Sequence, residues 1–327
     1  MNQARLAKVA QQLCQPGKGI LAADESSGTI EKRFKTINLA STETNRKNWR
    51  ELLLTTPGIS WFISGVILYD ETLRQKIKRD PGIVVGIKVD MGAKPLAGFP
   101  GETVTEGLDG LRERLAEYAK LGAQFTKWRA VINLGKGLPT TQAIQANAHA
   151  LVRFAALSQE AGLVPIVEPE TFMEGNHSIQ VHAAVTQKVL TAVFRQLKQY
   201  RVHLPGMLLK TNMVASGLEA KIQASPKQIA QETIKVFRST VPLKVPGIMF
   251  LSGGMSPEAS TINLDAINKS LDSARDKYTW QLSFSYGRAL QGEALEIWNG
   301  EGKNKPAAQQ AFYERAKKVA LARQGRL

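Results

Sequence analysis

Six residues with charged or hydroxyl side chains lie near the ends of apolar, strand-like runs. They are Lys88, Lys127, Glu168, Lys210, Ser252 and Arg288. Successive members are 36 to 42 residues apart, which is about the length of one strand and one helix. Parallel strands linked by helices bring their carboxyl ends to one rim of a barrel, and enzymes of that architecture keep their chemistry there. We therefore expect these residues to meet at one site.

Lys210 is the candidate nucleophile of that site. It follows the apolar residues 207–209, so it either reaches solvent from a strand end or is a desolvated amine. Burial and neighbouring cations would lower the pKa of such an amine, which could then attack a carbonyl and form a Schiff base. Lys88, Lys127 and Arg129 would supply the cations, but this segment alone leaves both alternatives open.

Three carboxylates could move the protons that Schiff-base chemistry requires. Glu168 and Glu170 flank Pro169, so both point to the same side of a regular strand. Asp24 ends the first apolar run. A carboxylate can help to expel water from the carbinolamine intermediate. The alternatives are salt bridges at the rim for the glutamates and a turn or helix cap for the aspartate.

Two groups of residues have the composition of phosphate sites. The first comprises Ser252, Gly253, Gly254, Ser285, Gly287 and Arg288, and the second comprises Ser26, Thr29 and Arg33. Glycines expose backbone N–H groups, serine adds a hydroxyl donor and arginine adds a forked donor. The first group follows the seventh and eighth apolar runs, where βα-barrels commonly bind phosphate. Tight turns and an ordinary helix N-terminus are the respective alternatives.

Eight apolar runs predict the strands that position these residues. The runs are residues 19–24, 61–70, 83–90, 125–132, 163–170, 207–214, 247–255 and 281–288. Helical patterns lie between most of them, at residues 108–122, 148–162, 181–200 and 225–241. Alternating strands and helices indicate an α/β fold, and eight strands favour closure into a (β/α)₈ barrel. Residues 71–82 are barely long enough for a helix, so an open doubly wound sheet remains the alternative.

The whole chain has the size and composition of one such barrel. It has 327 residues, 43% of them hydrophobic, and shows no linker or break in composition, so we expect a single domain over residues 1–327. No apolar stretch is long enough to cross a membrane, and the first residues have a helical pattern without a signal core. We therefore expect a cytoplasmic protein. Residues 270–281, before the last run, look slightly long, and we expect a loop there.

Metal and disulfide chemistry are disfavoured. The single cysteine, Cys14, excludes an intrachain disulfide, and the four histidines do not have the spacing of a metal site. The formal net charge is +15, which suits a polyanionic partner such as a phosphorylated metabolite, a nucleic acid or a membrane. The basic residues are dispersed and no nucleic-acid-binding motif accompanies them, so a nucleic acid is not expected.

With these residues in view, the chain resembles the class I fructose-bisphosphate aldolases. The resemblance lies in GKGILAADES, GIKVD, PLAGFPGETVTEGLDGL, KWR, IVEPE, LLKTNMV, FLSGG, INLDAIN and FSYGRALQGEAL, which cover nearly the whole chain in order. It implies a (β/α)₈ barrel, commonly a homotetramer, that needs no metal or cofactor. It also implies reversible cleavage of fructose 1,6-bisphosphate to dihydroxyacetone phosphate and glyceraldehyde 3-phosphate, in glycolysis and gluconeogenesis.

The resemblance also implies a role for each site residue. Lys210 would be the Schiff-base lysine and Glu168 the general acid/base, with Glu170 beside it. Lys127, Arg129 and Asp24 would assist proton transfer and position the hydroxyl groups. The phosphate nearer the ketone would bind Ser252, Gly253, Gly254, Ser285, Gly287 and Arg288. The distal phosphate would bind Ser26, Thr29, Arg33 and Lys88. Which of Asp24 and Glu168 takes the C4 hydroxyl proton stays open.

Two departures from the family pattern bear on these expectations. Family members with a long C-terminal tail end in a tyrosine that helps to protonate the enamine, whereas this chain stops at residues 324–327, where that tail would begin. We expect another group or water to perform that step. Position 29 is a threonine in a modestly different loop, and it retains a hydroxyl for the phosphate.

Two other functions remain as alternatives. The same chemistry could prefer fructose 1-phosphate or sedoheptulose 1,7-bisphosphate, which a kinetic comparison of the three sugars would decide. From a different class, the basic chain could serve as a binding or scaffold protein, whose binding would weaken steeply with salt and ignore active-site ligands.

Overall fold

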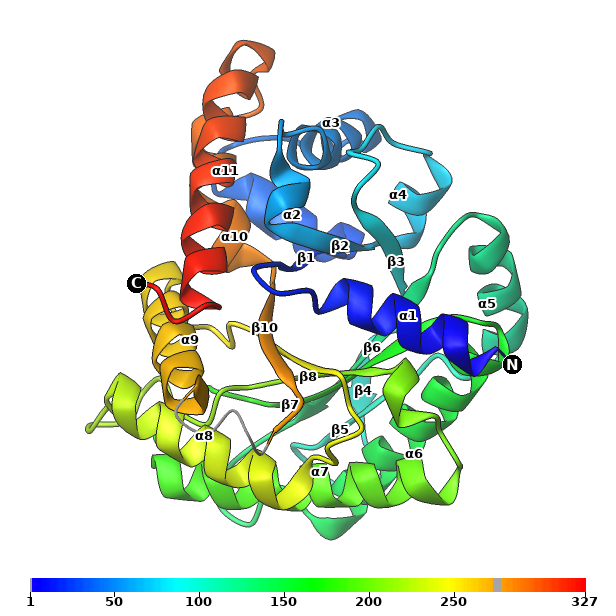
Figure 1. Ribbon diagram of the computed structural model, residues 1–327, viewed down its shortest axis with the longest axis vertical. Helices are drawn as coiled ribbons and strands as arrows, with labels where there is room; N and C mark the ends of the chain where they lie inside the picture. The colour runs from blue at the N-terminus through cyan, green and yellow to red at the C-terminus, as the bar shows by residue number, and fades with distance from the viewer. Residues whose placement is uncertain (1, 273–277) are drawn as a thin grey trace.

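Eight parallel strands close into a barrel at the centre of the molecule (Figure 1). The computed structural model describes residues 2–272 and 278–327. The strands follow one another around the barrel in the order β1-β10-β9-β8-β7-β6-β3-β2. Pairing of Ile20 in β1 with Ser285 in β10 closes the ring. The predicted (β/α)₈ barrel is therefore confirmed, and the open-sheet alternative is wrong.

Each barrel strand coincides with one of the eight predicted runs. The strands are β1 (Gly19–Ala23), β2 (Ile63–Leu68), β3 (Val84–Lys88), β6 (Phe125–Ile132), β7 (Val164–Thr171), β8 (Leu208–Thr211), β9 (Gly247–Phe250) and β10 (Gln281–Tyr286). Their residues are almost all buried, as expected for parallel strands that are covered on both faces.

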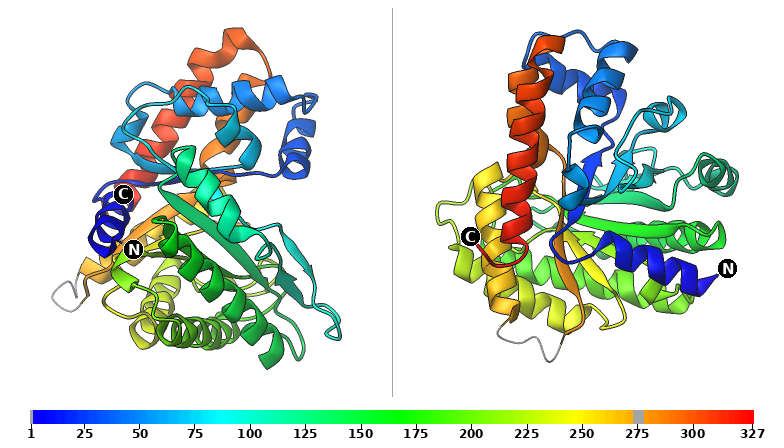
Figure 2. Two further views of the ribbon diagram at one scale, coloured as in Figure 1. Left: turned by 90° about the vertical axis from the view of Figure 1, so that its right-hand side faces the viewer. Right: turned by 45° about the horizontal axis from the view of Figure 1, so that its top comes forward.

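Helices surround the barrel, as Figures 1 and 2 show. They are α1 (Gln3–Leu13), α2 (Ser27–Lys35), α3 (Glu43–Leu54), α4 (Asp70–Arg74), α5 (Leu111–Lys120), α6 (Thr141–Glu160), α7 (Ile179–Gln199), α8 (Pro226–Thr240), α9 (Pro257–Asp272), α10 (Arg288–Trp298) and α11 (Lys305–Ala322). Short 3₁₀ turns lie at η1 (Ile59–Trp61), η2 (Leu204–Gly206) and η4 (Gly302–Asn304). The doubtful connection between β2 and β3 contains only the five-residue α4.

Local sequence signals explain where several of these helices begin and end. The side chain of Ser225 caps α8, and the side chain of Gln228 reaches back to it in a capping box. Gly122 and Gly162 follow α5 and α6 with φ angles of 95° and 77°, which glycine adopts without a Cβ penalty. The loop expected at residues 270–281 falls partly on residues 273–277, which lie outside the described residues.

The N-terminal helix α1 closes the amino end of the barrel. Its residues Leu6, Ala10 and Leu13 belong to one buried apolar cluster with inward-facing strand residues that include Phe125 and Ile166. A Cβ on Gly65 near the start of β2 would lie 2.6 Å from Cδ2 of Leu13, so this glycine makes room for the helix. The barrel interior is thus apolar at the amino end, which leaves the carboxyl end for polar chemistry.

A two-stranded antiparallel hairpin follows β3 and was not predicted. It consists of β4 (Ala93–Pro95) and β5 (Thr103–Thr105) and extends away from the barrel (Figure 2). Thr105 Oγ1 donates to the carbonyl of Arg129 at 2.7 Å, so the hairpin supports β6 beside the barrel mouth. Within the described residues, no helix is both long enough and apolar enough to span a bilayer.

Candidate active site

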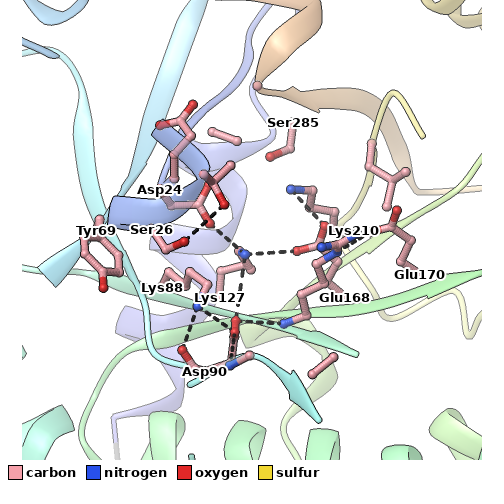
Figure 3. Close-up of a pocket in the computed structure, with 18 of the residues that line it drawn as sticks. Asp24, Ser26, Tyr69, Lys88, Asp90, Lys127, Glu168, Glu170, Lys210 and Ser285 are labelled. Carbon is pink, nitrogen blue, oxygen red and sulfur yellow. Dashed lines mark hydrogen bonds and ion pairs between the residues drawn. The ribbon is translucent and has the colours of Figure 1, made fainter. Parts of the chain in front are cut away.

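The carboxyl ends of the strands surround a cavity of about 1160 Å³. The cavity is lined by all sixteen residues that the sequence nominated: Asp24, Ser26, Thr29, Arg33, Lys88, Lys127, Arg129, Glu168, Glu170, Lys210, Ser252, Gly253, Gly254, Ser285, Gly287 and Arg288. Side chains two apart on a strand share a face, which is why β6 and β7 each contribute a pair. Figure 3 shows the lysines and carboxylates converging from opposite sides of the barrel.

Lys210 is a buried amine next to a buried carboxylate. It lies on β8, only 4% of the residue is exposed, and its Nζ is 3.0 Å from Oε1 of Glu168 on β7. The lysine therefore does not extend into solvent. The adjacent carboxylate is in position to take a proton from the amine or return one to it.

Lys127 occupies the centre of the charged cluster. Its Nζ lies 2.7 Å from Oδ2 of Asp24, 3.5 Å from Oε2 of Glu168 and 3.9 Å from Oδ2 of Asp90. Burial alone would lower the pKa of Lys127, but the three carboxylates outweigh it and raise the pKa above its usual value. Lys127 thus stays protonated at neutral pH and is a fixed positive charge beside Lys210.

Asp24 stays ionised for the converse reason. Burial would raise the pKa of this carboxyl, but the charges of Lys127, Lys210 and Lys88 outweigh it and lower the pKa to about 2. Such a group is a weak base. Its geometry suits holding Lys127 and accepting hydrogen bonds rather than taking protons.

Glu170 points from the same face of β7 as Glu168 but has a different partner. Its carboxylate pairs with the guanidinium of Arg129, which is on the neighbouring strand β6. Burial would lower the pKa of Arg129, and the charge of Glu170 outweighs it and raises the pKa. The two glutamates therefore have different surroundings, and Glu168 alone of this pair contacts Lys210.

The loop after β9 has the geometry of an anion-binding turn. Gly253 and Gly254 have φ angles of 52° and 80°, in the left-handed region that favours glycine. A Cβ on Gly254 would also lie 2.9 Å from Cδ1 of Leu218. Ser285, on the neighbouring strand β10, has a buried hydroxyl oxygen with no hydrogen-bond partner among the described residues. These exposed N–H groups and this unpaired hydroxyl are suited to a ligand with many acceptor oxygens.

The second predicted anion group lies at the amino end of α2. Ser26 Oγ and Thr29 Oγ1 are 3.1 Å apart, and Arg33 follows one helical turn later. Lys88 approaches from β3 on the same side of the cavity, as Figure 3 shows for Lys88 and Ser26. The two anion-binding groups therefore lie in the lining of one cavity, together with the Lys127 and Lys210 amines.

Comparison with known proteins decides the family. The family model described as fructose-bisphosphate aldolase class-I matches residues 5–327. The chain belongs to the class I fructose-bisphosphate aldolase family. Its relatives include a probable class 1 fructose-bisphosphate aldolase of Xylella fastidiosa, 52% identical over all of this chain and 99% of the relative. The cytosolic fructose-bisphosphate aldolase 4 of Arabidopsis thaliana is 49% identical over 92% of this chain and 78% of the relative.

A solved structure supports the same assignment. Fructose-bisphosphate aldolase from Plasmodium falciparum, solved in complex with TRAP and a small-molecule inhibitor, superposes with a TM-score of 0.95 at 45% identity. The superposition covers 99% of this chain and 95% of the other. The resemblance inferred from the sequence is therefore confirmed. The family is metal-independent and acts on sugar phosphates, and the matched relatives are fructose-bisphosphate aldolases, so neither a different sugar phosphate nor a scaffold role is favoured.

One site residue of this aldolase, Asp90, was missed by the sequence analysis. Its Oδ1 lies 2.7 Å from Nζ of Lys88, and its Oδ2 accepts from the backbone N–H of Arg129 at 3.2 Å. Asp90 also faces Lys127, so one buried carboxylate holds two of the cavity lysines. Its position two residues after Lys88, still at the strand end, is the signal that could have revealed it.

Glu25 and Arg50, which lie behind the distal anion-binding group of the aldolase, were also not predicted. Glu25 pairs with Arg33 and with Arg50, and Nη2 of Arg50 donates to the carbonyl of Glu25 at 2.9 Å. Arg50 is 1% exposed, and burial lowers its pKa. It lies on α3, and no local pattern in the sequence relates it to the site.

None of the four histidines, all of which lie in the described part of the chain, lines the cavity. His182 is buried and bonded to Thr171 Oγ1 at 2.6 Å, while His149 contacts the hydroxyl of Tyr200. Across the described ranges 2–272 and 278–327, no group of three or more His, Cys, Asp or Glu side chains has the arrangement of a metal site.

Proposed function

We propose that this class I aldolase reversibly cleaves fructose 1,6-bisphosphate to dihydroxyacetone phosphate and glyceraldehyde 3-phosphate through a Schiff base on Lys210. The observation that carries the proposal is the buried Lys210 amine, 3.0 Å from Glu168, in a cavity that is also lined by two anion-binding groups. A linear bisphosphate has its carbonyl carbon between two phosphates. Binding both ends would place that carbon near the amine.

The first half of the reaction builds the imine. Glu168 takes a proton from the Lys210 amine, which then attacks the C2 carbonyl and gives a carbinolamine. The same carboxyl group returns the proton to the C2 hydroxyl as it leaves as water. The positive charge of the resulting imine would lie among the carboxylates that now neutralise the two lysines.

The second half breaks the bond between C3 and C4. The bonding pair moves into the protonated imine to form an enamine, while the C4 hydroxyl loses its proton and becomes the aldehyde. Of the two candidates for that proton, we assign it to Glu168, which contacts the Lys210 amine directly, whereas Asp24 pairs with Lys127 and its pKa is held at about 2. Asp24 then serves to hold Lys127 near the reacting hydroxyl groups. Protonation of the enamine at C3 and hydrolysis release the second triose phosphate.

The phosphate assignments complete the proposal. Ser252, Gly253, Gly254, Ser285, Gly287 and Arg288 bind the phosphate nearer the ketone, and Ser26, Thr29, Arg33 and Lys88 bind the distal one. Arg129, paired with Glu170, contacts the sugar hydroxyls between them. The support is the position of both groups in the lining of the same cavity.

We also propose that residues 1–327 form one domain, that the chain assembles as a homotetramer and that it is cytoplasmic. A single closed barrel with no linker supports the first, and the family supports the second. The similarity to a cytosolic aldolase of Arabidopsis thaliana supports the third. Light scattering after size-exclusion chromatography measures the subunit count, and a monomer would contradict the tetramer.

Borohydride trapping tests the central proposal. The protein is incubated with fructose 1,6-bisphosphate and EDTA, reduced with borohydride and analysed by peptide mass spectrometry. We expect a reduced adduct on Lys210 that is lost in Lys210→Met. An adduct on Lys127 or Lys88 instead would overturn the assignment of the nucleophile, and the absence of any adduct on the folded protein would overturn the mechanism.

A further inference from the structure

Asn212 is a buried amide directly behind the anion-binding loop. It follows β8, two residues after Lys210, and is 1% exposed. Its Oδ1 accepts from the backbone N–H of Thr171 at 2.8 Å and lies 3.2 Å from the hydroxyl of the same residue. A backbone N–H can only donate, so this contact identifies the amide oxygen and turns the NH₂ group the other way.

The NH₂ group of Asn212 is an unused donor. Nδ2 is buried and has no hydrogen-bond partner among the described residues. It lies 3.2 Å from the position of a Cβ on Gly253, so it faces the backbone of the anion-binding loop. Leaving a buried donor unpaired costs free energy, so a partner acquired when the loop binds its ligand would stabilise that bound state.

Further contacts hold the amide in this orientation. The hydroxyl of Thr171 lies 2.6 Å from Nε2 of His182, and the other ring nitrogen of His182 lies 3.0 Å from the backbone nitrogen of Ala215. These residues come from β7, α7 and the segment after β8, and β7 and β8 pair as neighbours (Figure 1). Asn212 is thus held by rigid elements rather than by the loop that it faces.

Peptide geometry explains what the donor is for. In a trans peptide unit the N–H and C=O groups point in opposite directions. When loop N–H groups turn into the cavity toward a phosphate, the carbonyls of the same peptide units turn away from it. Asn212 is not among the described residues that line the cavity, and its Nδ2 lies beside Gly253, so a loop carbonyl that turns away from the cavity could reach it. The carbonyl of Ser252 already accepts from the backbone N–H of Met255 at 2.9 Å, which leaves the carbonyls of Gly253 and Gly254 as acceptors.

We propose that Asn212 is a positioning residue for the loop Ser252–Gly254, whose NH₂ group donates to a loop carbonyl and so stabilises the orientation that binds phosphate. The proposal rests on the assignment of this loop to the phosphate nearer the ketone. In this proposal Thr171 and His182 act indirectly, because they orient the amide of Asn212. Glycine at position 253 then serves a second purpose, since a Cβ there would press on Asn212 and on Met173.

The experiment compares the two triose phosphates as inhibitors of Asn212→Ala. By the proposed assignment, the phosphate of dihydroxyacetone phosphate binds the loop Ser252–Gly254, whereas the phosphate of glyceraldehyde 3-phosphate binds the distal anion-binding group. Losing one hydrogen bond should raise the inhibition constant of dihydroxyacetone phosphate about five- to tenfold. The constant for glyceraldehyde 3-phosphate should stay within about twofold, because the distal group does not contact Asn212, and KM should rise more than kcat falls.

Two further variants keep the test decisive. Thr171→Val removes the hydroxyl but leaves the backbone N–H, so a selective rise of about two- to threefold is expected. If Asn212→Ala does not fold, Thr171→Val serves as the test. An unchanged ratio of the inhibition constants of the two triose phosphates in Thr171→Val would then overturn the proposal. Thr186→Val is the matched control: this buried hydroxyl on α7 has no hydrogen-bond partner in the described structure, so both constants should stay unchanged.

Equal weakening of both triose phosphates in Asn212→Ala would show a general structural role and overturn the proposal, as would unchanged constants. The outcome is separable from that of the proposed function. Absence of a Lys210 adduct in the parent protein would refute the Schiff-base mechanism. A selective loss of dihydroxyacetone phosphate affinity, measured by calorimetry, would support the role of Asn212 even then.

Discussion

At the scale of single residues, one carboxylate connects the two buried amines of the cavity. Glu168 contacts Lys210 through Oε1 at 3.0 Å and Lys127 through Oε2 at 3.5 Å. The Lys127 contact keeps the carboxylate close to a permanent positive charge, while the Lys210 contact gives it a proton to exchange. Because both contacts depend on the carboxylate, we predict that the charge of Glu168 contributes more to kcat than its shape does.

Glu168→Gln tests that prediction. The amide preserves the shape, but its one oxygen can accept from only one of the two lysines, and it cannot carry protons to and from Lys210. We expect kcat to fall about 10²- to 10⁴-fold, as is typical for loss of a general acid/base. Formation of the borohydride-trapped adduct should slow in parallel. Glu160→Gln removes an exposed carboxylate that pairs with Arg112 and should leave kcat unchanged; a similar loss in both variants would contradict the assignment.

Not every site residue could be predicted from the sequence, and the reason is physical. Lys127 and Glu168 lie in apolar strands, where a charge is unexpected and so attracts notice. Arg50 lies on α3 among other polar residues, and its burial against Glu25 depends on how that helix packs on the barrel. Asp90 lies in the motif GIKVD, which is part of the resemblance, but no role was predicted for its side chain.

At the scale of elements, the strands could be predicted closely because buried parallel strands are continuous apolar runs. The β4–β5 hairpin could not, because its strands have three residues each and its stability comes from contacts such as Thr105 to Arg129. The role of α1 was also not predicted. Its apolar face was visible in the sequence, but the surface that it covers depends on the closed barrel.

The position of α1 predicts a change in stability without a change in chemistry. Leu13 is fully buried at the amino end of the barrel, whereas Lys210 and Glu168 lie near the carboxyl ends of their strands. We expect Leu13→Ala to lower the free energy of unfolding by about 2–5 kcal/mol, as for other buried leucines, with kcat unchanged at 25 °C. Urea denaturation measures the first and a coupled assay the second. Gln12→Ala, exposed on the same helix, should change neither, and a loss of kcat in the folded Leu13→Ala protein would show that the two ends of the barrel are coupled.

At the scale of the whole molecule, the net charge of +15 attracts an anionic substrate. Long-range attraction raises the rate of encounter with a bisphosphate and weakens as salt screens it. We expect kcat/KM for fructose 1,6-bisphosphate to fall several-fold between about 20 and 200 mM NaCl, with kcat nearly constant. A fall in kcat of the same size would point to an effect of salt on the site itself.

Stability of the whole molecule should also depend on pH through His182. This side chain is fully buried and bonded to Thr171 and Ala215, and burial lowers its pKa to about 4. The neighbouring ring of His177, 5.5 Å away, adds to the shift. In the unfolded chain the pKa returns to about 6.5. Between these two values the unfolded chain binds a proton that the native protein does not.

The sign of the effect follows from that difference. The contribution of His182 is complete above about pH 6.5 and is lost as the pH falls toward 4, because protonation then favours the unfolded chain. The loss should be about 2 kcal/mol at pH 5 and about 3 kcal/mol at pH 4. Urea denaturation at pH 7.5 and pH 5, at one protein concentration, should show this term in the parent protein and not in His182→Gln, which has no titrating ring. His149→Gln, at an exposed position, should lose the same unfolding free energy between pH 7.5 and pH 5 as the parent protein. An equal loss in the parent and in His182→Gln would show that the buried ring does not control acid stability.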